Sequence, residues 1–118
     1  MHELSVAQEI FSLVLNHVEE RRLKSVLNVK VKIGRLSNVL HDSLLFCFDA
    51  VKAGTKLENA SLVIVESPVM VLCQGCNSTT EIEPPRFICG ACGCINVKMI
   101  SGTELLLHQI ELNDNEKE

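Results

Sequence analysis

The sequence predicts an α+β fold in which two helices cover a three-stranded sheet, and a small cysteine-rich ribbon is inserted before the last strand. Three observations predict it. Apolar residues recur at helical spacing in two segments, they alternate at strand spacing in others, and paired cysteines crowd the stretch between the last two strands. We expect residues 1–67 with 101–113 to form the α+β domain, residues 68–100 the ribbon, and residues 114–118 a frayed acidic tail.

The first predicted helix runs from about Ser5 to Arg22. Its apolar residues recur every three or four positions, with polar residues between them, which is typical of an amphipathic helix; they include Val6, Ile10, Val14 and Val18. Ser5 and Gln8 have the spacing of a capping box, in which each side chain pairs with a backbone donor of the first turn. This places residues 1–4 just outside the helix.

The second helix is predicted from Ser43 to Ala53, with Asp42 as its N-cap and Gly54 closing it. Apolar and polar residues alternate from Val26 to Ile33, which predicts a strand with one buried face. Further strands are expected at residues 61–66 and 104–112.

Composition excludes several classes of protein. The formal net charge is −4, aromatic residues make up 3% of the chain, and Trp and Tyr are absent. Such a chain lacks the positive surface and the aromatic platform that bind nucleic acid. No apolar run approaches the length of about 18 residues that a membrane span needs, and no signal sequence is evident. We therefore expect a cytoplasmic protein that binds neither membranes nor nucleic acid.

Four of the six cysteines form two C-x-x-C pairs separated by twelve residues: Cys73, Cys76, Cys89 and Cys92. Each pair can offer two thiolates from one tight turn, and two such turns complete a tetrahedral sulfur site. Asn77 and Gly93 follow the pairs, and both tolerate the left-handed backbone that these turns need. The spacing predicts structural zinc, so the inserted module is expected to be a zinc ribbon.

Other interpretations of the cysteines are weaker. One is that the cysteines are buried thiols that bind no metal. Another is that one C-x-x-C pair is redox-active, but neither pair lies in a thioredoxin-like context. Cys94 is interpreted as a bystander or an oxidation-sensitive thiol, and Cys47 as a small buried hydrophobe. A closed four-thiolate site has no open position for substrate, so we expect a protein that is not an enzyme.

The N-terminus, reading Met1, His2, Glu3, contains a second possible metal site. Met1 should be retained because His2 is too large for methionine removal. The α-amine, the His2 amide nitrogen and the His2 imidazole can then chelate one ion in a nearly planar arrangement. Planar nitrogen-rich sites suit Ni²⁺ and Cu²⁺. The competing interpretation is a solvent-exposed His with no task. The same interpretation is the safer one for His41, which lies in the loop after the first predicted strand.

Several motifs together make the chain similar to a known family. MHELSVAQEI at the terminus, IGRLS followed by FCFDAV, and the two C-x-x-C pairs before a final strand resemble the HypA/HybF family of hydrogenase maturation nickel chaperones. The resemblance extends from Met1 to about Leu112. This chain has Leu40, His41 and Asp42 where family members often carry an acidic residue.

The resemblance implies nickel bound through Met1, His2 and Glu3, and structural zinc on Cys73, Cys76, Cys89 and Cys92. It also implies delivery of Ni²⁺ to the large-subunit precursor of [NiFe] hydrogenase, in cooperation with the GTPase HypB; some relatives also serve urease. The oligomeric state and the fourth nickel ligand stay open.

Two other functions compete with this interpretation. The chain could be a zinc-ribbon adaptor for proteins or nucleic acid with an incidental N-terminal His. It could also be a thiol oxidoreductase that uses Cys92 and Cys94. The charge balance counts against nucleic acid, and the closed thiolate site counts against the enzyme.

Overall fold

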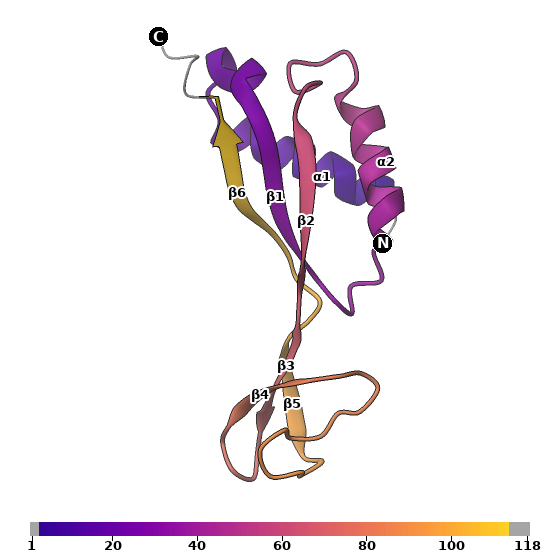
Figure 1. Cartoon of the computed structure of the whole chain (residues 1–118), viewed down its shortest axis with the longest axis vertical. Helices are drawn as coiled ribbons and strands as arrows, with labels where there is room; N and C mark the ends of the chain where they lie inside the picture. Colours follow the sequence, from indigo (N-terminus) through magenta and orange to yellow (C-terminus); the bar gives the residue numbers. More distant parts are fainter. Residues whose placement is uncertain (1–2, 114–118) are drawn as a thin grey trace. The chain divides into compact units, whose positions relative to one another are not determined.

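The computed structural model describes residues 3–113 and contains two α-helices, one 3-10 helix and six strands (Figure 1). In chain order they are α1 (Glu3–His17), η1 (Glu20–Ser25), β1 (Val26–Gly34), α2 (His41–Lys52), β2 (Ser61–Ser67), β3 (Val69–Cys73), β4 (Thr79–Ile82), β5 (Val97–Ser101) and β6 (Leu105–Leu112). Neither α-helix in this part of the chain has the length and apolarity that crossing a membrane requires.

Contacts divide the described residues into two compact units. The helical unit comprises residues 3–31, 38–65 and 106–113, and the ribbon unit comprises residues 32–37 and 66–105. One three-stranded sheet has the order β2-β1-β6, and the other has the order β4-β3-β5. The predicted α+β class, with two helices, a three-stranded sheet and an inserted ribbon, is confirmed. The ribbon unit includes a segment, residues 32–37, that lies outside the predicted ribbon boundaries of 68–100.

The core of the helical unit forms where the two helices pack on one another and on the sheet. Figure 1 shows α1 passing behind the strands of the β2-β1-β6 sheet, with α2 beside it. Fully buried side chains come from both α-helices and from β1, because each of these has an apolar face: Val6, Ile10 and Val14 on α1, Leu44 and Phe48 on α2, and Val29 and Val31 on β1.

The predicted extent of the first helix was wrong at both ends. α1 begins at Glu3 and ends at His17, so Ser5 lies within the helix and is no N-cap. The backbone is extended at Glu19 before η1 begins. The apolar stripe stops at Val18, and the next buried apolar side chain is Leu23, which is too far along the chain to continue the same helical face.

The second helix begins at His41, two residues earlier than predicted. Leu40 is its N-cap and makes no side-chain capping hydrogen bond, and Asp42 lies in the first turn. A carboxylate in the first turn still interacts favourably with the helix dipole. At the other end Gly54 has φ +76°, the left-handed conformation expected of the residue that closes a helix.

The ribbon unit is built on β3, which pairs antiparallel with β4 on one side and with β5 on the other. Val69 lies opposite Ile82 in the β3–β4 register, and Cys73 lies opposite Val97 in the β3–β5 register. Val69, Val71 and Ile82 form a small buried core. The sequence did not predict the strand at residues 97–101.

The segment that follows β1 completes this small core. Leu36 packs against it, and the Leu36 N–H donates to the Gly102 carbonyl at 2.7 Å. A Cβ atom at Gly34 would lie 2.2 Å from the Gly102 carbonyl carbon, so the two chain segments can approach only because residue 34 is glycine. Arg35 also pairs with Glu83 at 2.6 Å. The GRLS motif therefore serves the ribbon unit.

Candidate metal centres

Two loops of the ribbon unit carry the paired cysteines. Cys73 ends β3, and the chain turns back after Cys76 through Asn77, which has φ +63°. The second loop turns through Gly93, with φ +80°. In each loop the left-handed residue donates its N–H to the carbonyl of the first cysteine of the pair, at 3.0 Å for Cys73 and 2.9 Å for Cys89. The left-handed backbone expected at these two positions is present.

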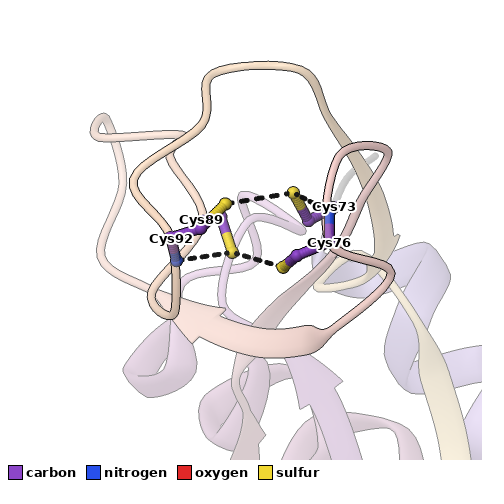
Figure 2. A group of neighbouring side chains, drawn as sticks. All are labelled: Cys73, Cys76, Cys89 and Cys92. Atoms are coloured by element: carbon purple, nitrogen blue, oxygen red, sulfur yellow. Dashed lines mark hydrogen bonds between the residues drawn. The ribbon is translucent and has the colours of Figure 1, made fainter.

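The two loops bring four sulfurs to one point (Figure 2). The ligand atoms of Cys73, Cys76, Cys89 and Cys92 all lie within 4.8 Å of one another. Sγ of Cys73 lies 3.6 Å from Sγ of Cys92, and Sγ of Cys76 lies 3.7 Å from Sγ of Cys89. Zn–S bonds of about 2.3 Å in a tetrahedron require sulfurs about 3.8 Å apart. The spacing therefore fits a tetrahedral ion such as Zn²⁺.

Backbone N–H groups surround the first sulfur of each pair. Those of Gly75 and Cys76 lie 3.2 and 3.3 Å from Sγ of Cys73. Those of Ala91 and Cys92 lie 3.3 and 3.4 Å from Sγ of Cys89. Donors at these positions stabilise a thiolate, which is the form of cysteine that binds a metal.

Backbone donors and neighbouring sulfurs shift the pKa values of two thiols in opposite directions. The N–H groups of Cys92 and Ala91 lower the pKa of Cys89 to about 6. The N–H of Cys94 acts to lower the pKa of Cys92, but the three other sulfurs of the cluster raise it to about 12. Without a cation, four neighbouring sulfurs cannot all carry negative charge, because like charges repel. A divalent cation removes this conflict.

The two remaining cysteines lie outside the cluster. Sγ of Cys94 accepts the N–H of Asn96 at 3.4 Å and is half-buried. Cys47 was interpreted from the sequence as a buried hydrophobe. In the structure it is only half-buried and lines a surface hollow beside the start of α1.

Of the predicted nickel residues, Met1 and His2 lie outside the described part of the chain. Glu3 is the first residue of α1, and its Oε2 accepts the N–H of Leu40 at 2.9 Å. Leu40 is the N-cap of α2, so this hydrogen bond joins the starts of the two helices. The role of Leu40 was missed because a backbone donor leaves no signal in the sequence.

The comparisons with known proteins agree from one end of the chain to the other. A family model described as "HypA: Hydrogenase/urease nickel incorporation, metallochaperone, hypA" matches residues 1–112. "Hydrogenase maturation factor HypA" of Nostoc sp. strain PCC 7120 is 36% identical over 114 residues, which cover 97% of each chain. The protein of the same name from Geotalea daltonii is 40% identical over 105 residues, covering 89% of this chain and 93% of the relative.

Two solved structures are similar in fold. The solution structure of the Ni metallochaperone HypA from Helicobacter pylori has a TM-score of 0.68 and 24% identity, covering 95% of this chain and 97% of that one. A second structure, titled "Solution structure of HypA protein", has a TM-score of 0.71 and 24% identity, covering 96% and 97%. At this identity the likeness concerns the fold.

Proposed function

Because this chain belongs to the HypA family of metallochaperones, which are not enzymes, we propose that it carries Ni²⁺ for the maturation of [NiFe] hydrogenase. The observation that carries the proposal is the family match over residues 1–112, which includes the N-terminal motif and both cysteine pairs. The family description names hydrogenase and urease, while the curated relatives are named hydrogenase maturation factors, which favours hydrogenase.

In this proposal Met1, His2 and Glu3 form the nickel site. Three nitrogens bind the ion: the α-amine, the His2 amide nitrogen and the His2 imidazole. The amide must lose its proton, so nickel affinity falls as pH falls. The hydrogen bond from Leu40 to the Glu3 carboxylate supports a positioning role for Glu3 at this site. A fourth, exchangeable position lets the ion pass to a partner.

We further propose that Cys73, Cys76, Cys89 and Cys92 hold a structural Zn²⁺. The sulfur separations and the N–H donors around Cys73 and Cys89 support this assignment. When bound, the ion crosslinks the two loops and neutralises the thiolates. All four ligands come from the protein, so this site stabilises the ribbon and has no position for substrate.

The partners are proposed from the family alone. They are the GTPase HypB and the large-subunit precursor of [NiFe] hydrogenase, and the compartment is the cytoplasm. The negative net charge of −4 supports protein partners over nucleic acid.

The test is a nickel titration of the untagged protein beside two variants: His2→Ala, and a chain with one residue added before Met1. We expect both changes to abolish tight nickel binding, because the chelate needs a free α-amine next to His2. Zinc content and circular dichroism serve as controls and should not change. Undiminished nickel binding by the extended chain contradicts the N-terminal site and leaves the zinc-ribbon adaptor as the better explanation.

A further inference from the structure

A surface hollow of about 660 Å³ lies between the first turns of the two α-helices. It is lined by Glu3, Leu4 and Ser5 of α1 and by Asp42, Ser43, Phe46 and Cys47 of α2. All of these residues belong to the helical unit. Glu3, which lines the hollow, also belongs to the proposed nickel motif.

The hollow exposes large apolar side chains that the fold does not need for its core. Phe46 is 75% exposed, whereas Phe48, two residues later on α2, is fully buried. Leu4 in the same lining is 48% exposed, and Leu40 immediately before α2 is 65% exposed. Single exposed apolar residues are common, but an aromatic and a leucine in the lining of one hollow, with a third exposed apolar side chain just before α2, indicate an interaction surface.

The charge of the hollow indicates what binds there. Its two charged lining residues, Glu3 and Asp42, are both acidic, and its described lining contains no Lys or Arg. Asp42 and Phe46 are four residues apart on α2 and therefore share one face of the helix. Within residues 3–113 Asp42 has no ion-pair partner. A ligand that complements this surface has an apolar side chain for Phe46 and Leu4, flanked by positive charge.

We propose that this hollow binds a positively charged, apolar segment of a partner protein, and that this contact brings the partner's own metal ligands to the N-terminal nickel motif. The purpose of the contact rests on the proposed function, but the contact itself does not. Direct transfer from a site with an exchangeable position needs the receiving ligands to be close before the ion dissociates. An apolar contact beside that site provides this proximity. An anionic membrane surface is disfavoured, because Glu3 and Asp42 would repel it.

The test uses a labelled synthetic peptide with a central pair of leucines flanked on both sides by lysines. Two control peptides replace the lysines by glutamates or the leucines by serines. Binding is measured by fluorescence anisotropy, and alkylation of Cys47 is mapped by mass spectrometry on the zinc-loaded protein, since Cys47 lines the hollow. We expect only the Lys–Leu peptide to bind and to protect Cys47 from alkylation.

Variants of the protein locate the contact. Phe46→Ser should weaken binding by about tenfold or more, and Asp42→Asn by about two- to fivefold with a smaller salt dependence. Leu106→Ser is the matched control: Leu106 is 53% exposed but lies on β6, outside the lining of the hollow, and its affinity should match that of the original protein. Circular dichroism checks the fold of each variant.

Four results overturn the proposal. Three are equal binding of the Lys–Leu and Glu–Leu peptides, undiminished binding by Phe46→Ser, and failure of all peptides to bind. The fourth is self-association of the protein that Phe46→Ser abolishes, which would assign the hollow to a second copy of this chain. A nickel titration of the same samples separates the two proposals: intact nickel binding without peptide binding rejects only the contact, whereas absent nickel binding rejects the proposed function.

Discussion

The two candidate metal sites differ in how the protein builds them. The four cysteines come from two loops whose left-handed turns and N–H donors hold the sulfurs at tetrahedral spacing. The proposed nickel site uses the chain terminus, where a short sequence alone supplies three nitrogens. A site closed by four protein ligands retains its ion, and a site with an open position can release it. The first suits structure and the second suits cargo.

The largest expected effect comes from a substitution that unfolds the ribbon unit and leaves the proposed nickel site intact. Cys73→Ala removes one of four thiolates, and structural Zn²⁺ sites contribute about 10–16 kcal/mol of apparent binding free energy in small domains. We expect loss of bound zinc and loss of dispersed amide resonances for residues 69–101, with the helical unit still folded. Elemental analysis and nuclear magnetic resonance measure both.

Cys94→Ala is the matched control for this prediction. Cys94 lies outside the four-sulfur cluster, so this variant should keep its zinc. Unfolding of the whole chain by Cys73→Ala would show that the two units are not separately stable.

The next prediction compares the two phenylalanines of α2. Phe48 is fully buried, so Phe48→Ala should lower the free energy of unfolding by about 3–5 kcal/mol. Phe46 is 75% exposed, so Phe46→Ala should change it by less than about 0.5 kcal/mol. Urea denaturation measures both. The nickel stoichiometry of the folded Phe48→Ala variant should not fall, because the proposed chelate involves only the N-terminal residues. Similar losses of stability in Phe48→Ala and Phe46→Ala would contradict the assigned burial.

A smaller effect tests the close approach of two segments in the ribbon unit. In Gly34→Ala the new Cβ would lie 2.2 Å from the Gly102 carbonyl carbon and oxygen, so the backbone must shift. We expect a loss of about 1–3 kcal/mol in the free energy of unfolding. Gly75→Ala is the control, because its new Cβ would lie 3.6 Å from the nearest sulfurs, an ordinary contact. Thermal melts of the zinc-loaded proteins rank the two, and equal melting temperatures would argue against the close approach.

The smallest expected effect is on the pH dependence of stability. The Ser67 hydroxyl and then the Gly102 N–H donate to the Glu104 carboxylate and lower its pKa below the ordinary value of 4.5. Because the pKa is lower in the folded state, this stabilisation is present above the unfolded-state pKa and is lost as pH falls through the folded-state pKa. Glu104→Gln should cost about 1–2 kcal/mol at neutral pH. Its difference from the original protein should shrink in acid, as measured by denaturation at a series of pH values; a constant difference would reject this role.

Much of the fold could be predicted because its signals are local. Alternation identified β1 within one residue of its end, and the positions of Asn77 and Gly93 indicated the turns of the cysteine loops. The predicted capping box at Ser5 failed because a contact from a distant part of the chain replaces it: Leu40 holds Glu3, and α1 starts there. β5 was missed because its burial is incomplete along its length, so its residues do not alternate clearly.

The sequence by itself determined the fold class, the family and the choice of the four cysteines as candidate zinc ligands. The reason is that helical period, strand period and ligand spacing are properties of residues close together in the chain. Only the tertiary structure decided that residues 32–37 belong with the ribbon unit and that Phe48 is buried while Phe46 faces solvent. Both are apolar residues on one helix, and their environments depend on which neighbouring elements cover each face. Packing between segments far apart in the chain sets that choice, and no local pattern encodes it.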